Sequence, residues 1–245
     1  MQTASKPQNT GQGTRTLVDD LVHEDVVALA QPGARIVRVG KRGGCQSTPQ
    51  SYIEKLMISA LRSGEAVVRL KGADPFIFGR GGEESKHLQA ACIAVNEING
   101  ITSGLAAVTA LGVPLTHRQH ARSVLFVTGH ARPGGSGTDW TKLAETAHRE
   151  HLTLTIYMGV SGAGRIQHGL LAGLPAQTPV TTIQNATLVD QRHAVCALRS
   201  ARHAGARGSW QSECEHRRRT AWPDCSTMRS TRRATLCLKG DRAGI

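Results

Sequence analysis

The chain has 245 residues and a formal net charge of +12, and hydrophobic residues make up 39% of it. This length is enough for one large or two small domains with a buried core. No apolar run approaches the roughly 18 residues that a membrane-spanning helix needs, which excludes a protein anchored by such helices.

The positive charge is unevenly distributed. Residues 193–245 contain eleven Lys and Arg residues against four acidic ones, whereas the first 192 residues contain nineteen against fourteen. The body of the chain is therefore only mildly basic, and we expect any contact with nucleic acid to be non-specific and made through residues 193–245. The N-terminus lacks the apolar core of a secretory signal, and six cysteines without such a signal predict a reducing, cytoplasmic location.

Helices and strands are predicted to alternate from about Thr16 to Arg192, after a polar, aperiodic stretch at 1–16 that we interpret as a disordered lead. Thr48 is expected to cap a helix that starts at Pro49 and ends at Gly64. The other predicted helices are 83–92, 105–111, 140–150 and 163–174. The predicted strands are 36–39, 66–70, 124–128, 152–158 and 179–183. This alternation predicts an α/β protein with parallel sheets.

The polar, basic residues 116–123 are interpreted as a connector between an N-terminal α/β domain, 17–115, and a C-terminal α/β domain, 124–192. The pattern stops near His193. Residues 193–245 are rich in Arg and Cys and contain one valine and one isoleucine. We interpret this tail as the product of a reading-frame change, with a basic binding tail as the alternative. Cys214, Cys225 and His216 lack the spacing of a zinc site, so no metal is expected.

The most specific stretch is Leu70–Glu84, LKGADPFIFGRGGEE. It follows a predicted strand and precedes a predicted helix, an arrangement that binds nucleotide-like ligands in open α/β sheets. Its glycines, at 72, 79, 81 and 82, are expected to let the backbone approach a ligand closely or to adopt positive φ. A tight turn without a ligand is the alternative, and the glycines alone favour it.

The whole string closely resembles the cofactor loop of the uroporphyrinogen-III C-methyltransferases, within the tetrapyrrole methylase family. The usual form there is LKGGDPFIFGRGGEE, so that Ala73 stands at the second glycine. The similarity covers roughly Val18–Arg192, and further motifs occur in the family's order. They are LVDDLV at 17–22, VGKRGG at 39–44, STPQ at 47–50, GITSG at 100–104, PLTHR at 114–118, VTGH at 127–130, YMG at 157–159 and QNAT at 184–187.

The resemblance implies a two-domain tetrapyrrole methylase fold with a cofactor cleft between the domains, and a homodimer. It also implies transfer of two methyl groups from S-adenosylmethionine to carbons 2 and 7 of uroporphyrinogen III, giving precorrin-2 for sirohaem and cobalamin synthesis. The cofactor's sulfonium already carries an activated methyl group, so the reaction needs no metal. A methyltransferase acting on another precorrin, and an incompetent truncated product with a basic tail, are the alternatives.

By resemblance, eight residues would contact the cofactor: Gly72, Ala73, Asp74, Ile77, Thr102, Ser103, Met158 and Ala186. Asp19 falls on the family's proposed proton acceptor and Lys41 on its proposed proton donor. Attack by a pyrrole carbon leaves a cation that must lose a proton, and a carboxylate can take it; from the residues alone, Asp19 would be a solvated loop acid. Arg42 and Arg118 are expected to bind the substrate's carboxylates, with scattered surface charge as the alternative.

Two departures from the family concern the two ends of the chain. Family members open with a strand and a GPGDP-type loop, and neither is recognisable here. We therefore expect the first strand, central to the first sheet, and the last strands of the second domain to be missing, which would leave an unpaired apolar edge prone to aggregation. Ala73 is expected to be tolerated if its φ is negative and costly if it is positive.

Overall fold

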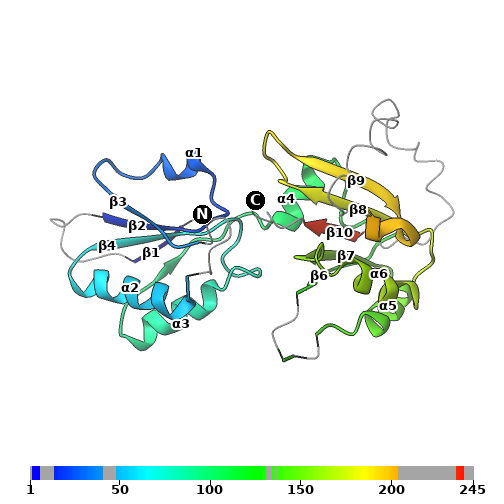
Figure 1. The fold of residues 1–245 in the computed structure, drawn as a ribbon, viewed down its shortest axis with the longest axis horizontal. Coiled ribbons are helices and arrows are strands. Elements are labelled where there is room, and N and C mark those ends of the chain that lie inside the picture. The colour runs from blue at the N-terminus through cyan, green and yellow to red at the C-terminus, as the bar shows by residue number, and fades with distance from the viewer. Residues whose placement is uncertain are drawn as a thin grey trace. The chain divides into compact units, whose positions relative to one another are not determined.

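The computed structural model describes residues 2–5, 14–40, 48–130, 134–135, 137–203 and 236–239. The chain divides into two compact units, the first ending at Thr102 and the second starting at Ser103 (Figure 1). In the described part of the chain, no helix has the length and hydrophobicity to cross a membrane.

The first unit is an α/β layer built on a sheet with the strand order β3-β2-β4-β1-β5. Its strands are β1 (Gln2–Ser5), β2 (Thr14–Val18), β3 (Arg35–Arg38), β4 (Ala66–Leu70) and β5 (Asn96–Glu97). Its helices are α1 (Glu24–Val27), α2 (Gln50–Arg62) and α3 (Gly81–Ala90). Strand β2 runs parallel to β3 and β4, whereas β1 is antiparallel to its neighbours β4 and β5.

Helices α2 and α3 cover one face of this sheet (Figure 1). On α2, Ile53, Met57 and Ala60 recur at helical spacing and are buried. They join Leu17 of β2 and Val67 of β4 in the core of the unit. The helix starts one residue later than expected: Pro49 is its N-cap residue, and no side chain caps the first turn.

Strand β1 occupies an interior position in the sheet, where the sequence analysis expects a missing strand. Residues 2–5 and 14–16, interpreted there as part of a disordered lead, lie in β1 and β2. The physical reason is that an interior gap would leave backbone N–H and C=O groups of β4 and β5 without partners. An extended segment of almost any sequence can satisfy them, because ladder hydrogen bonds are made by the backbone.

The second unit has a sheet with the strand order β6-β7-β10-β8-β9, in which the pairings are parallel except for β8 with β9. Its strands are β6 (Ser123–Thr128), β7 (Leu152–Tyr157), β8 (Pro179–Gln184), β9 (Arg192–Ala197) and β10 (Leu236–Lys239). Its helices are α4 (Ser103–Ala110), α5 (Trp140–Arg149), α6 (Ala163–Leu171) and the 3₁₀ helix η1 (Leu198–His203).

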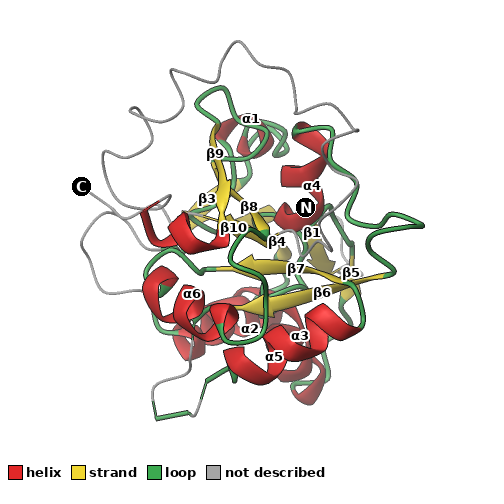
Figure 2. Cartoon of the chain, turned by 90° about the vertical axis from the view of Figure 1, so that its right-hand side faces the viewer, coloured by secondary structure: helices red, strands yellow, loops and turns green. Residues whose placement is uncertain are grey.

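Helices α5 and α6 cover one face of this second sheet, and α4 lies on the other (Figure 2). Leu154 and Ile156 of β7 point to the α5 and α6 side and are buried with Trp140 and Leu170. On the opposite face, Ile183 packs against α4. The packing of α4 explains why the structure divides the chain at Ser103, ahead of the expected connector at 116–123.

The chain beyond His193 contributes more to the fold than the sequence pattern indicates. Strand β9 pairs with β8 along its whole length, and β10 lies between β7 and β8. Leu198 and Ala201, in η1, are buried in the core of the second unit. The last strands that the sequence analysis expects to be missing are therefore represented by β9 and β10. The edge strand β9, the short interior strand β10 and a short 3₁₀ helix need no apolar alternation, which is why the pattern gave no signal.

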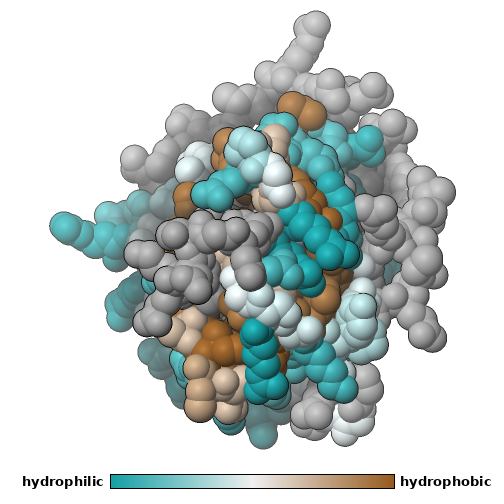
Figure 3. All heavy atoms as spheres, turned by 90° about the vertical axis from the view of Figure 1, so that its left-hand side faces the viewer, coloured by the Kyte–Doolittle hydropathy of each residue, from teal (hydrophilic) through white to brown (hydrophobic). Residues whose placement is uncertain are grey.

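Hydrophobic residues also occur on the surface of the first unit. Leu21, Leu29 and Phe76 are among its exposed large hydrophobic side chains. On the face drawn in Figure 3, the visible hydrophobic atoms form several patches between hydrophilic ones. Scattered apolar exposure of this kind is usual on protein surfaces.

Candidate functional site

Parallel strands bring two of the expected functional segments to one edge of the first sheet. Asp19 directly follows β2, and residues 71–80 form the loop that follows β4. The amide of Asp19 donates a hydrogen bond to the Leu70 carbonyl over 3.1 Å, which fixes the two strand ends side by side. Lys41 and Arg42, the expected proton donor and substrate ligand, lie outside the described residues.

The Asp74 carboxylate organises the loop after β4. Its Oδ1 accepts hydrogen bonds from the amides of Phe76, over 2.8 Å, and Ile77, over 3.2 Å. Its Oδ2 accepts one from the amide of Gly100, over 3.1 Å. Because Asp74 is 9% exposed and satisfies three backbone donors, its side chain shapes the loop and ties it to the segment before Thr102. The contacts that this loop offers to a ligand are therefore those of its backbone and of exposed side chains such as Ile77.

The backbone of this loop is strained at residues other than glycine. Ala73, Phe78 and Arg80 have φ values of 64°, 55° and 59°. Each such conformation costs an L-residue on the order of 1–2 kcal/mol. Strain at this density is a feature of ligand-binding and active sites, where the surrounding structure must hold the backbone in place.

Two of the loop glycines lie where a side chain would clash with the protein itself. A Cβ atom on Gly72 would lie 2.6 Å from the Cβ of Leu21, and one on Gly79 would lie 2.6 Å from the Pro75 carbonyl oxygen. These glycines allow the loop to pack closely against the protein itself. Positive φ is instead adopted by their neighbours, including Ala73 at the position of the family's second glycine.

Replacing Ala73 with glycine is expected to stabilise the first unit by about 1 kcal/mol, because glycine adopts positive φ without steric cost. Urea unfolding, followed by hydrogen exchange of first-unit amides, measures the change. The matched control is Ala90→Gly at the end of α3, which should lower stability, since glycine is the poorer helix former. A loss of stability in the Ala73→Gly variant would contradict the strained conformation.

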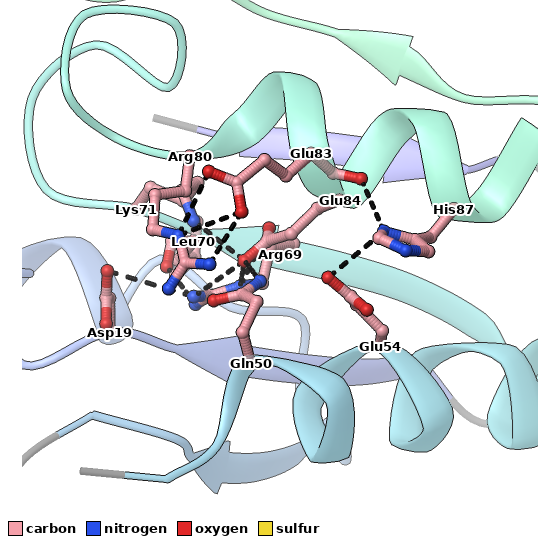
Figure 4. A network of polar contacts seen from close by, with 10 residues as sticks. All are labelled: Asp19, Gln50, Glu54, Arg69, Leu70, Lys71, Arg80, Glu83, Glu84 and His87. Carbon is pink, nitrogen blue, oxygen red and sulfur yellow. Dashed lines mark hydrogen bonds and ion pairs between the residues drawn. The ribbon is translucent and has the colours of Figure 1, made fainter. Parts of the chain in front are cut away.

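A buried ionic network lies beside the start of the loop (Figure 4). The Glu84 carboxylate, from α3, accepts hydrogen bonds from Lys71 Nζ over 2.9 Å and from Gln50 Nε2 over 2.8 Å. Its Oε2 lies 3.3 Å from Arg69 Nε, and the Nη2 atom of Arg69 lies 3.8 Å from Asp19 Oδ2. Arg69, Lys71 and Glu84 are each less than 5% exposed. The expected proton acceptor, Asp19, is thus the more solvent-exposed end of a buried charge network.

Burial and the charges in this network shift two pKa values. Burial, and then the charge of Arg69, lower the pKa of Lys71 despite its contact with Glu84. Burial acts to raise the pKa of Glu84, but the charges of Arg69 and Lys71 and two hydrogen bonds outweigh it, so that the pKa is lowered. Glu84 is therefore held as a carboxylate. The one signal of this network in the sequence is a charged residue, Arg69, inside the apolar run AVVRL.

In the second unit, three of the expected cofactor residues lie at the carboxyl edge of the sheet. Ser103 starts α4, whose next residue, Gly104, donates its amide hydrogen to the hydroxyl of Tyr157 over 3.0 Å. Met158 directly follows β7 and has a φ of 53°. Ala186 follows β8 and packs against the hydrophobic cluster on α4. Thr102, which precedes α4, is buried.

Arg118 lies at the other edge of the second sheet. It is exposed in a turn closed by backbone hydrogen bonds between His117 and Ala121. The backbone amide of Arg122 donates a hydrogen bond to the carbonyl of His151, and these two residues directly precede β6 and β7. The structure therefore does not bring Arg118 together with Met158, which follows the last residue of β7. Within the described residues, no group of three or more His, Cys, Asp or Glu side chains is arranged to hold a metal ion.

Residues 13–202 match the family described as Tetrapyrrole (Corrin/Porphyrin) Methylases. The chain belongs to this family. The match confirms the resemblance carried by the loop after β4, and it extends beyond residue 192, where the sequence pattern stops. It includes β9 and the buried turn that contains Leu198 and Ala201.

Within this family, the chain is similar to proteins that act on uroporphyrinogen III or make siroheme, according to their names. The chain is 51% identical to a uroporphyrinogen-III C-methyltransferase of Pseudomonas aeruginosa over 177 residues, which is 72% of this chain and 70% of that protein. It is 44% identical over 193 residues to siroheme synthase 1 of Pectobacterium atrosepticum, covering 78% of this chain but 39% of that protein. The chain thus spans about two fifths of the siroheme synthase that it matches.

Solved structures support the same fold. The uroporphyrin-III C-methyltransferase of Thermus thermophilus, complexed with S-adenosyl homocysteine, matches with a TM-score of 0.64 and 32% identity over 80% of this chain and 81% of that one. A cobalt precorrin-4 methyltransferase matches with the same TM-score at 22% identity, covering 76% of this chain and 75% of that one, and so shares the fold alone. The expected α/β tetrapyrrole methylase fold is therefore confirmed.

Proposed function

We propose that the chain transfers methyl groups from S-adenosylmethionine to carbons 2 and 7 of uroporphyrinogen III, giving precorrin-2. The observation that carries this proposal is the loop after β4, shaped by the three hydrogen bonds of Asp74. The 51% identity to the Pseudomonas aeruginosa uroporphyrinogen-III C-methyltransferase supports the substrate. The Thermus thermophilus structure, complexed with S-adenosyl homocysteine, supports the cofactor.

In the first unit, the exposed side chain of Ile77 offers an apolar contact to a cofactor, and the strained backbone after β4 offers peptide groups to its polar parts. Met158 and Ala186, in the second unit, stay predictions as cofactor contacts. The cofactor supplies an activated methyl group, so the protein's contribution is to align it with the carbon nucleophile.

In this proposal Asp19 accepts the proton that the methylated carbon must lose. Its position supports the role, because it stands at the edge of the first sheet beside the cofactor loop and is 35% exposed. Lys41 as proton donor and Arg42 as a ligand of substrate carboxylates stay predictions. Arg118 stays one as well, and its place at the amino edge of the second sheet gives it no support.

An assay with uroporphyrinogen III and S-adenosylmethionine under anaerobic conditions tests the proposal, with mass spectrometry of the tetrapyrrole. A product carrying two added methyl groups is expected. Asp19→Asn should lower turnover by about 100-fold, the scale of a lost general base, while S-adenosylhomocysteine still binds. Asp25→Asn, which changes a carboxylate that is 90% exposed, is the control. Methylation of a later precorrin and not of uroporphyrinogen III would refute the substrate, and equal turnover in the Asp19→Asn variant would refute the base.

A further inference from the structure

Glu84 is the centre of the buried network beneath the candidate base (Figure 4). It is 2% exposed. Its carboxylate accepts hydrogen bonds from Lys71 and Gln50 and forms an ion pair with Arg69. A carboxylate at this depth is tolerated only because cations and hydrogen bonds compensate its desolvation. The same contacts leave its position fixed, since any displacement would leave buried charges unpaired.

Arg69 is held from two sides. Glu84 contacts its Nε and Nη2 atoms, and its Nη1 donates a hydrogen bond to the carbonyl of Leu70 over 3.0 Å. The same Leu70 carbonyl accepts the amide hydrogen of Asp19. The Arg69 guanidinium and the Asp19 backbone are therefore both hydrogen-bonded to the Leu70 carbonyl, at the end of β4. From this position Nη2 faces the Asp19 carboxylate at 3.8 Å.

The charges explain why Arg69 turns toward Asp19. Arg69 and Lys71 are two buried cations, and Glu84 offsets one of them. The Asp19 carboxylate, whose Oδ2 lies 3.8 Å from Arg69 Nη2, offsets part of the remaining positive charge. Attraction between the two therefore limits the orientations that Asp19 can adopt at the edge of the sheet.

We propose that Glu84 is a positioning residue of the methyl transfer. By fixing Arg69, it holds the Asp19 carboxylate where it accepts the proton, while Lys71 completes the charge balance. This inference rests on the proposed function, since it acts through Asp19 and touches neither substrate nor cofactor.

The decisive comparison is between Glu84→Gln and Glu24→Gln, the same substitution outside the candidate site. Glu24, in α1, is 70% exposed and pairs with Arg38. Glu84→Gln should lower kcat about 10- to 100-fold, the scale of a small misplacement of a reacting group. Its KM and its dissociation constant for S-adenosylhomocysteine should change less than about threefold, because ground-state binding is left intact. Glu24→Gln should keep kcat within about twofold of the parent, as expected for an exposed ion pair.

A second variant separates positioning from folding. Glu84→Gln leaves two buried cations with one carboxylate, and the protein then unfolds more easily. Lys71→Met combined with Glu84→Gln removes one charge of each sign and is expected to recover the thermal midpoint. Because Arg69 still lacks its anchor, kcat should stay low in the double variant. Recovery of kcat together with stability, or a stable Glu84→Gln variant with unchanged kcat, would overturn the proposal.

A measurement without turnover keeps this inference distinct from the proposed function. The Nε–H group of Arg69 should give an exchange-protected NMR signal in the parent, shifted in Asp19→Asn and lost in Glu84→Gln. If the parent does not methylate uroporphyrinogen III, the proposed function fails while these signals still report on the positioning. If the Arg69 Nε–H signal is the same in the parent, in Asp19→Asn and in Glu84→Gln, then Glu84 does not position Asp19 through Arg69.

Discussion

Asp74→Ala is expected to destabilise the first unit by about 3 kcal/mol and to weaken S-adenosylhomocysteine binding by about 100-fold. The substitution removes the acceptor of three backbone N–H groups, those of Phe76, Ile77 and Gly100. A partly buried donor left without a partner costs about 1–3 kcal/mol. Without these hydrogen bonds the loop must also be ordered when the ligand binds. A cost of about 2–3 kcal/mol for ordering the loop corresponds to the expected 100-fold loss in affinity.

Two variants make the Asp74 experiment specific. Asp74→Asn retains an acceptor for Phe76 and Ile77 but loses the carboxylate oxygen that serves Gly100, so an intermediate effect is expected. Asp25→Ala removes an exposed carboxylate from the same unit and should change neither quantity. Calorimetric titration gives the affinity, and urea unfolding gives the stability. Weakened binding without any loss of stability would mean that Asp74 contacts the ligand directly and does not act by shaping the loop.

The sequence predicted best those elements whose side chains are buried on one clear face. Strand β4 has the expected bounds, and helix α2 buries Ile53, Met57 and Ala60 as their spacing indicates. In the second unit, β7 and β8 each end within one residue of the prediction. Apolar periodicity reports on packing against a core, and these elements obtain their stability from that packing.

The elements missed from the sequence are those held by backbone pairing. Strands β1 and β5 carry too few apolar residues to show alternation, and β9 lies beyond the point where the periodic pattern stops. Each of the three is held by backbone hydrogen bonds to a neighbouring strand. Their existence depends on neighbours far away in sequence, which no local pattern contains.

In the candidate site, too, the sequence identified a residue, and the structure was needed to show its contacts. The resemblance identified Asp74, and the structure adds that its oxygens are occupied by the loop's own amides. Sequence spacing did not reveal that Arg69 and Glu84 meet under Asp19, because their contact depends on how α3 packs against β4.

Gly72→Ala is expected to destabilise the first unit by about 2–3 kcal/mol, the upper range for overpacking a close contact. The added Cβ would lie 2.6 Å from the Cβ of Leu21 and 2.9 Å from its carbonyl oxygen. The contact includes backbone, so it cannot be relieved by turning a side chain. The loop and the residues after Asp19 would have to move apart, and S-adenosylhomocysteine binding should weaken with them.

Gly82→Ala, ten residues further along, is the matched control and should have the opposite effect. A Cβ there meets only ring atoms of Phe76, at 3.6 and 3.8 Å, which is ordinary contact. Gly82 lies in the first turn of α3, where alanine is the better helix former by up to about 1 kcal/mol. Urea unfolding of both variants should thus give changes of opposite sign from the same substitution. Equal losses would mean that this stretch needs glycine throughout, and that the approach of Gly72 to Leu21 is not what decides its place in the loop.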